Sequence, residues 1–205
     1  MSPVATTHPV RSHKEDRQQA LVLAAFNQIA ERGFEGLRTR EVAAGVGLNI
    51  ATLHYYFPTK EALIRGVVAH SMDRFRSTLA PHGSPGDQLR NHLRAVRKLL
   101  RDEPEVGAVM GELALRSARD PSLARIMGEA FQAWHRTLRG LLQRAARDGH
   151  LARELDTDDV AALIMATLTS MTLPSTADRT DRAFRQLERW LGLVPQKARR
   201  NKSSN

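Results

Sequence analysis

The sequence contains many titratable side chains, but their spacing does not build a catalytic or metal site. Eight histidines are present, yet none forms a His-x-x-x-His pair or follows a Glu at Glu-x-x-His spacing, the patterns by which a helix presents ligands to a metal. Asp156, Asp158 and Asp159 diverge in direction on a helix and are better interpreted as acids of a helix N-terminus. Neither a glycine-rich phosphate loop after a strand nor a Gly-x-Ser-x-Gly motif occurs. The residues therefore predict no enzymatic activity, no metal and no cofactor.

A different chemistry is concentrated in residues 39–63, TREVAAGVGLNIATLHYYFPTKEAL. Apolar Val42, Leu48 and Leu53 are spaced to hold two short helices against a third. The outward residues, 49–52 and 54–56, are small where the edges of bases would approach and aromatic with polar tips where phosphates would lie. This pattern predicts a helix-turn-helix, with one helix across the phosphate backbone and the next in the major groove. The alternative is an aromatic helix end packed in another small helical domain.

Caps and breakers predict the helices that position this tract. The first is expected over 13–32 and ends at Gly33, and the second covers 40–46, with Thr39 as N-cap and Gly47 as its stop. Asn49 caps a third over 50–57. Pro58 ends it, and Thr59 caps a longer helix that stops near Pro81.

Further helices are expected after a linker at 82–86. They cover 84–101, 103–118, 120–148, 156–172 and 176–191, as indicated by apolar residues at helical spacing and by acidic or Pro starts. No segment alternates as a strand would. The prediction is an all-α protein of about nine helices, with an N-terminal arm and helix-turn-helix domain at 1–58, a helical effector-binding and dimerisation domain at 59–195 and a basic disordered tail at 196–205.

Composition restricts the partners. The chain of 205 residues is 41% hydrophobic and carries a net charge of +9, which favours a polyanion such as nucleic acid or an acidic membrane surface. There is no cysteine, which fits a reducing compartment. No apolar run approaches the ~20 residues of a membrane span, and the first residues lack a secretory signal. A cytoplasmic protein that does not enter a membrane is expected.

The tract resembles, without a gap, the turn, recognition helix and following helix start of the TetR (AcrR-like) family of transcriptional regulators. The match is carried by residues 47–63, with Thr39, Arg40, Val42 and Ala43 where the family's second helix begins. It covers about residues 15–70, and the remainder agrees only in length and helical character.

The resemblance implies contacts with double-stranded DNA, residue by residue. Phosphate contacts fall on Thr39, His54, Tyr56 and Lys60, and base or groove contacts on Arg40, Ile50, Ala51, Thr52 and Tyr55, with Asn49 at the start of the helix. Three positions depart from the family's pattern. Asn49 stands where Ser is frequent, Ala51 where Gly or Pro is common, and His54 where Tyr is usual. Asn49 and His54 keep a polar side chain at these positions, but the operator sequence cannot be inferred from these residues.

The resemblance also implies a homodimer, a small effector and, by family default, repression. The last two helices would form the dimer interface as a four-helix bundle, with candidate seam residues Leu163, Thr167, Met171, Phe184, Leu187 and Trp190. A cavity for the effector would be lined by Met72, Phe75, Leu100, Met110, Leu113, Phe131, Trp134, His135 and Leu138. The plainer interpretation is that both sets are intramolecular core. Few charges interrupt the second set, which favours a lipophilic effector.

Two further functions are compatible with the basic composition. A nonspecific nucleic-acid coating protein would bind DNA with steep salt dependence and little sequence preference, whereas a regulator prefers one palindrome. A helical membrane-surface protein is less favoured, because the apolar stripes are distributed through the chain and do not adjoin one Lys-rich face.

Overall fold

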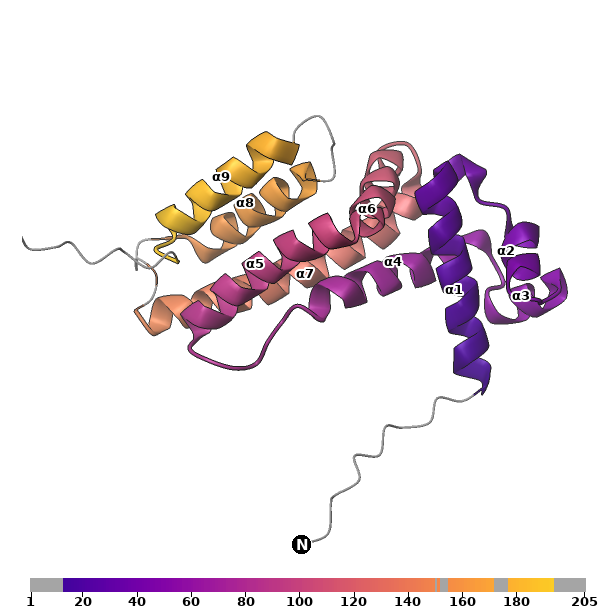
Figure 1. Ribbon diagram of the computed structural model, residues 1–205, viewed down its shortest axis with the longest axis horizontal. Coiled ribbons are helices and arrows are strands. Elements are labelled where there is room, and N and C mark those ends of the chain that lie inside the picture. The colour runs from indigo at the N-terminus through magenta and orange to yellow at the C-terminus, as the bar shows by residue number, and fades with distance from the viewer. Residues whose placement is uncertain (1–12, 150, 152–154, 172–176, 194–205) are drawn as a thin grey trace, which may run out of the picture. The chain divides into compact units, whose positions relative to one another are not determined.

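The computed structural model describes residues 13–149, 151, 155–171 and 177–193. Within these residues the chain forms helices and connecting segments, and no strand. The elements are α1 (His13–Arg32), a short 3-10 helix η1 (Phe34–Gly36), α2 (Thr39–Gly45), α3 (Ile50–Tyr56), α4 (Lys60–Arg76), α5 (Pro85–Asp102), α6 (Pro104–Ser117), α7 (Pro121–Arg147), α8 (Thr157–Ser170) and α9 (Ala177–Trp190) (Figure 1). The predicted all-α fold of about nine helices is confirmed.

The first compact unit ends at Val67 and contains α1, α2, α3 and the beginning of α4. Its core is formed by fully buried apolar side chains at helical spacing: Leu21, Ala25, Phe26, Ile29, Val42, Leu53, Phe57 and Leu63. Between α2 and α3, Gly47 adopts φ 69°, and its N–H donates to the Ala44 carbonyl. A left-handed residue is how a helix commonly ends and the chain turns, so Gly47 sets the turn between the two short helices.

The division into units falls later than the predicted boundary at residue 58. The second unit begins at Val68, within α4. The reason is close packing at Gly66, where an added Cβ would lie 2.9 Å from Val22 Cγ2 and 3.3 Å from Phe57 Cε1. The start of α4 therefore belongs to the core of α1 and α3.

The second unit is built from the end of α4 and from α5 to α9. Helix α7 packs against α5, α6 and α8, and α8 also packs against α9. Helix starts follow the predicted caps: the Ser84 side chain accepts from the Asp87 N–H, Asp120 from Leu123 and Asp156 from Asp159. The predicted start of the last helix, at residue 176, and the basic tail lie outside the described residues.

Two predicted helix ends were wrong. Thr39 lies inside α2, whose N-cap is Arg38 with no side-chain cap. Helix α4 ends at Arg76 and not near Pro81. The Ser77 hydroxyl donates to the Arg74 carbonyl and the Thr78 hydroxyl to the Phe75 carbonyl, which satisfies acceptors at the helix end.

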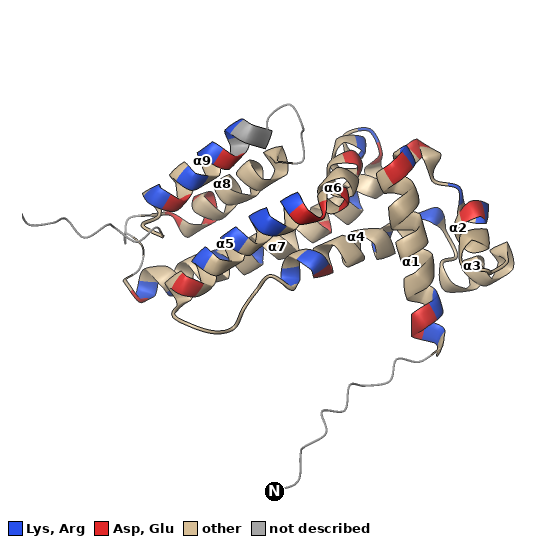
Figure 2. Ribbon diagram, viewed as in Figure 1, with Lys and Arg blue, Asp and Glu red and all other residues tan. Residues whose placement is uncertain are grey.

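Charged residues join α5 to α9 inside the second unit. Arg97 is mostly buried and forms ion pairs with Asp181 and with Glu188, while the Arg90 guanidinium donates to the Leu193 carbonyl after α9. Arg97 also lies over the Phe184 ring, 5.1 Å from its centroid. Figure 2 shows basic residues along both helices. This cluster attaches α9 to α5 through charge as well as through apolar burial.

Candidate nucleic-acid interface

Helix α3 turns one side to the core and the other to solvent. Leu53 is buried, whereas Ala51, His54 and Tyr55 are exposed, and the Tyr55 side chain has 70% of its surface free. Half-buried residues flank this side: Ile50, Thr52 and Tyr56. Of the outward set predicted from the sequence, the exposed members on α3 therefore share one side of a short helix, in the position of a recognition helix, and the half-buried members border it.

Asn49 fixes the first turn of α3. Its Oδ1 accepts from the Thr52 backbone N–H at 2.8 Å and from the Thr52 hydroxyl at 3.0 Å. The predicted N-cap is therefore present. Because this oxygen is occupied by Thr52, the amide nitrogen is the Asn49 group best placed to reach a ligand.

Cations lie against the aromatic rings around α3. The Lys14 ammonium is 5.8 Å from the centroid of the Tyr55 ring, and the Lys60 ammonium is 4.5 Å from that of Phe34. Tyr55 and Tyr56 meet edge to face with centroids 5.2 Å apart. Lys60 was expected at this site, but Lys14 was missed. The signal that could have found it is its place in the first turn of a helix predicted to begin at residue 13.

Helix α2 offers Arg40 to solvent, while Thr39 is half-buried. Two neighbouring arginines are exposed, but their guanidinium groups interact with other residues of the first unit. Arg32 pairs with Glu41 at 2.7 Å, and Arg38 donates to the Glu35 carbonyl at 2.5 Å. Of the basic residues on and beside α2, Arg40 is therefore the one best placed to reach DNA.

A small apolar cavity lies in the second unit, with a volume of about 30 Å³. We call it the Trp134 cavity; it is lined by Phe75, Leu100, Met110, Gly111, Phe131, Trp134, Leu168 and Thr169. The Phe75 and Trp134 rings stack in it, with centroids 5.0 Å apart and planes 17° apart. Five of the nine residues predicted to line an effector cavity meet here, namely Phe75, Leu100, Met110, Phe131 and Trp134.

The other four predicted cavity residues lie elsewhere. Met72, Leu113 and Leu138 are buried in the core and do not line the Trp134 cavity. His135 Nε2 is 3.2 Å from the Asp158 carbonyl oxygen, so this side chain joins α7 to the start of α8.

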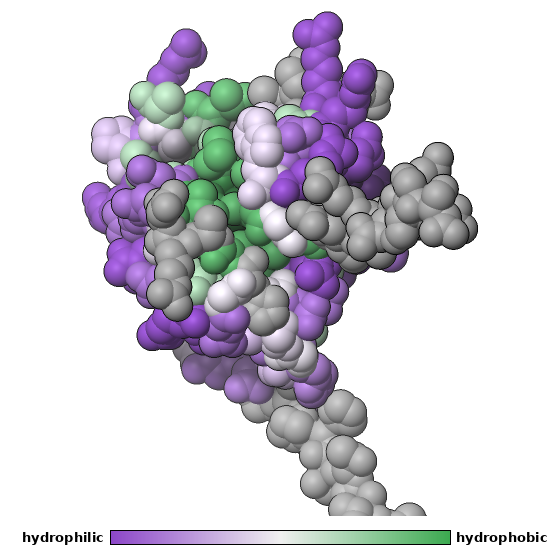
Figure 3. All heavy atoms as spheres, turned by 90° about the vertical axis from the view of Figure 1, so that its left-hand side faces the viewer, coloured by the Kyte–Doolittle hydropathy of each residue, from purple (hydrophilic) through white to green (hydrophobic). Residues whose placement is uncertain are grey.

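The six predicted seam residues divide by burial. Phe184 and Leu187 are buried within this chain, and Thr167 and Met171 are half-buried. Leu163 is 48% exposed and Trp190 is 72% exposed. Figure 3 shows an apolar area bordered by hydrophilic side chains on the face of the molecule that it presents. Part of α8 and α9 is therefore left unpartnered by this chain.

Two negative findings bear on the alternatives. In the described part of the chain, no group of three or more His, Asp or Glu side chains is placed to hold a metal ion. Among the same residues, no helix has the length and apolarity needed to cross a membrane.

The all-α fold and the exposed side of α3 define a DNA-binding protein of the helix-turn-helix class with a second helical domain. Residues 21–67 match the family model described as bacterial regulatory proteins, tetR family, and residues 79–187 match the tetracyclin repressor-like C-terminal domain. The chain belongs to the TetR family of DNA-binding transcriptional regulators.

Relatives of known name agree with this assignment. The nucleoid occlusion factor SlmA of Pasteurella multocida is 30% identical over 144 residues, which cover 68% of this chain and 72% of SlmA. The regulator RutR of Escherichia coli K12 is 29% identical over 96 residues, 43% of each chain.

Solved structures show the same fold. A TetR transcriptional regulator from Chloroflexus aurantiacus superposes with a TM-score of 0.72 at 24% identity, covering 86% of this chain and 94% of that one. Salmonella enterica GusR gives a TM-score of 0.75 at 18% identity, covering 88% and 97%.

Proposed function

We propose that this regulator is a repressor that binds a palindromic operator as a homodimer and releases it when a small apolar effector binds. The observation that carries the proposal is the exposed side of α3, capped by Asn49 and matched within the tetR family model. Repression is the family default. As a protein that acts on bacterial chromosomal DNA, it would work in the cytoplasm.

The DNA contacts are divided between bases and phosphates. Base edges and the groove are proposed to be met from two helices. From α3 the contacts are Ile50, Ala51, Thr52 and Tyr55, and from α2 the contact is Arg40. Thr39, His54, Tyr56 and Lys60 are proposed to hold phosphates, and Lys14 joins them because its ammonium lies beside Tyr55. Phosphate contacts position the protein, whereas base contacts give sequence preference.

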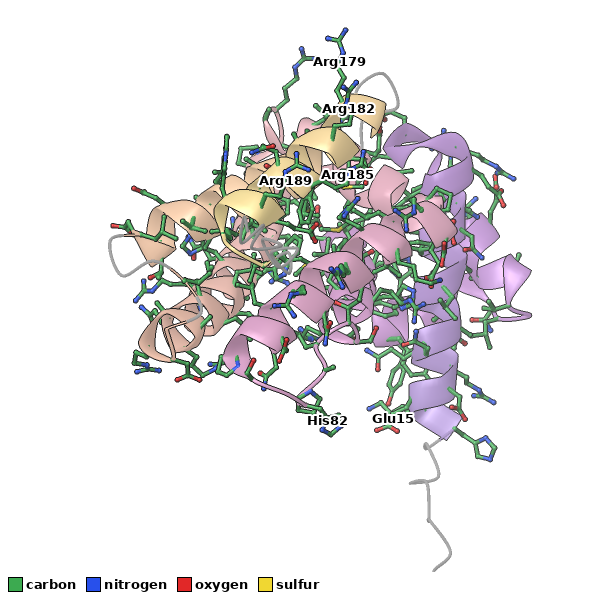
Figure 4. The ribbon with its side chains drawn as sticks, turned by 60° about the vertical axis from the view of Figure 1, so that its left-hand side comes forward. Glu15, His82, Arg179, Arg182, Arg185 and Arg189 are labelled. Carbon is green, nitrogen blue, oxygen red and sulfur yellow. The ribbon has the colours of Figure 1, made fainter. Side chains whose placement is uncertain are left out.

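The homodimer is proposed to form through α8 and α9. Leu163 and Trp190 are large apolar side chains left exposed on helices that pack together, and exposed alanines beside them, Ala166 and Ala183, permit close approach of another helix. Arg179, Arg182, Arg185 and Arg189 extend outward from α9 (Figure 4). An apolar centre with a charged border is the usual anatomy of an interface.

The effector is proposed to enter the Trp134 cavity. Phe75 lines it near the end of α4, and α4 begins in the first unit at Lys60. A ligand that separates Phe75 from Trp134 would therefore act on a helix shared with the DNA-reading unit. The ligand weakens operator binding only if it prefers the conformation that binds DNA poorly.

Selection of bound fragments from genomic DNA tests this function. The purified protein is incubated with sheared DNA, the bound fragments are sequenced, and the recovered duplex competes against random duplex. A regulator recovers one two-fold symmetric site beside a few genes, with half-sites about 34–36 Å apart or a multiple. Unrelated sequences recovered at similar affinity would contradict the proposal and favour a nonspecific coating protein.

A further experiment separates a second candidate function. One relative is named a nucleoid occlusion factor, and the second candidate is a protein that binds DNA without controlling the neighbouring genes. A promoter reporter fused to the recovered site distinguishes the two. Repression by this protein supports the proposal, and an unchanged or increased signal contradicts it.

A further inference from the structure

The wall of the Trp134 cavity contains a buried hydrogen-bond donor without a partner. Trp134 is only 7% exposed, and no atom of the described residues accepts a hydrogen bond from its Nε1. A buried indole N–H usually finds an acceptor, and leaving one unpaired costs free energy. In a cavity wall, this donor is available to an acceptor brought by a ligand.

The rest of the lining excludes a charged ligand. Phe75, Met110 and Leu168 are buried and apolar, and no ionisable side chain is among the lining residues. The Thr169 hydroxyl belongs to an exposed residue that already has a polar interaction. A charge placed among these groups would lose its hydration without a compensating partner.

The stacked aromatic rings of the cavity wall favour a flat ring, although the cavity must widen to admit one. Its volume of about 30 Å³ holds no more than a few waters, whereas small-molecule sites are roughly 300–1,000 Å³, so a ligand must displace part of the lining. Leu100, Gly111 and Phe131 are half-exposed, so displacing them loses less buried contact than displacing the buried lining residues. The nearly parallel Phe75 and Trp134 rings offer flat faces against which another ring can stack.

We infer that the Trp134 cavity takes an uncharged, mainly apolar ring compound with one hydrogen-bond acceptor, which receives the Trp134 Nε1–H. This inference rests on the proposed effector function and specifies its ligand class. A carbonyl oxygen or a neutral ring nitrogen satisfies the donor, and a pure hydrocarbon of the same shape leaves it unpaired.

The test uses two probes of matched shape, acetophenone and α-methylstyrene, in which a methylene group replaces the carbonyl oxygen. The full-length Trp190→Phe protein leaves Trp134 as its one tryptophan, because the chain has two. In the ¹⁵N-labelled protein, acetophenone is expected to move the indole N–H proton resonance downfield at saturation. The hydrocarbon is expected to leave the shift closer to that of the free protein.

Affinities measured with Trp134→Phe complete the test. The ratio of the acetophenone Kd to the α-methylstyrene Kd is expected to rise roughly three- to tenfold when the N–H is removed, the range for one hydrogen bond. Using this ratio cancels the different hydration of the two probes. If Trp134→Phe does not fold, the resonance of the Trp190→Phe protein decides alone.

Three outcomes overturn the inference: an indole resonance that acetophenone leaves in place, an unchanged affinity ratio, or no binding of the ketone up to its solubility limit. Failure of the proposed function is recognised separately, by titrating operator DNA with and without the ketone. A ketone that binds as expected and leaves operator affinity unchanged supports the ligand class and contradicts release by this effector.

Discussion

Lys60 has a place both in the folded protein and in the proposed DNA site. Its ammonium lies over the Phe34 ring, and Lys60 is half-buried. Such a contact is worth about 0.5–1 kcal/mol even at an exposed site, so the cation is held beside α3 before DNA arrives. A positioned charge loses less side-chain freedom on binding a phosphate. A contact between a lysine and a phosphate gives no sequence preference, because every nucleotide of the duplex carries a phosphate.

Replacing this lysine should weaken binding to every duplex. In Lys60→Ala, affinity is expected to fall for operator and scrambled DNA alike, and the slope of log K against log salt should decrease by about 0.9 per subunit. Titrations at several salt concentrations measure both. Lys98→Ala is the matched control, because Lys98 is exposed and pairs with Asp102 on α5 of the second unit. A loss confined to the operator would contradict the phosphate assignment.

His92 gives the protein a dependence on pH. It is fully buried on α5, with Nδ1 2.7 Å from the Thr78 hydroxyl oxygen, and burial lowers its pKa to about 4. The ordinary pKa is about 6.5, so between these values the unfolded chain binds a proton that the folded chain does not. Stability is therefore complete above about pH 6.5 and decreases as pH falls toward 4.

The predicted contribution of His92 is a loss of up to about 3 kcal/mol of unfolding free energy across that window, since each pKa unit is worth about 1.36 kcal/mol. Urea unfolding of the wild type and of His92→Gln at pH 7, 6, 5 and 4 measures it. Carboxylates titrate in both proteins and cancel in the difference. Parallel pH profiles would show that His92 is not the group responsible.

Helix α9 depends on a charge cluster as well as on apolar burial. Arg97 faces two acids, and burial opposes the charged form of Asp181 while Arg97 holds the pKa of that carboxyl below its usual value. Glu188 is buried too, and one of its carboxylate oxygens, Oε1, has no partner among the described residues. A buried charge cluster is sensitive to loss of one member, because the remaining charges stay without compensation.

Arg97→Ala should therefore destabilise the protein by about 3 kcal/mol or more. Lys98→Ala, the next residue on the same helix, removes an exposed i,i+4 pair and should cost less than about 1 kcal/mol. Urea midpoints and slopes compare the two variants at pH 7. Equal and small losses would mean that α9 is held by its apolar residues alone.

Among the helices, the predicted starts were correct wherever a polar cap preceded an apolar stripe. Ser84, Asp120 and Asp156 began helices as expected, because their side chains accept N–H groups that the helix leaves unpaired. Thr39 has the right chemistry for a cap but lies inside α2. Cap chemistry alone does not fix this register, because helix boundaries vary by one or two residues and the α2 N-cap, Arg38, has no side-chain cap.

The candidate sites were predictable to different depths. The outward side of α3 follows from the helical period, once Leu53 is assigned to the core. The lining of the cavity cannot be predicted from the helical period. The period identifies the inward face of a helix, but it does not say which inward residues border a cavity and which are packed in the core. Met72 is therefore as good a candidate as Phe75 in the sequence, yet it packs in the core, and Thr169 lines the cavity from an exposed position.

Across the whole molecule, the excess of basic over acidic residues is not concentrated in the proposed DNA-binding unit. Residues 13–67 contain seven Lys and Arg and six Asp and Glu, whereas the full chain contains 31 and 22. The excess that suggested a polyanionic partner therefore lies mostly outside the described part of the first unit. The proposed sequence preference therefore rests on the geometry of α3 and not on net charge, and two subunits bound together would multiply the preference of each.

Dimerisation is the step on which the proposed operator binding depends, and Trp190 is the residue with which to test it. It is 72% exposed on α9, so Trp190→Asp removes an apolar surface without disturbing this chain's core. Leu115→Asp is the matched control, because Leu115 is 67% exposed on α6, away from the proposed α8 and α9 interface. Circular dichroism should show both variants folded.

Sedimentation is expected to give monomers for Trp190→Asp and dimers for Leu115→Asp and the wild type. A charge buried in an interface without a partner commonly costs several kcal/mol, which is a loss of affinity of more than a hundredfold. The monomer should retain weak binding to scrambled duplex and lose its preference for the two-fold symmetric site, since one helix-turn-helix covers one half-site. A Trp190→Asp protein that sediments as a dimer would place the interface elsewhere, and the Phe184 side of α9, already buried in its own chain, could not replace it.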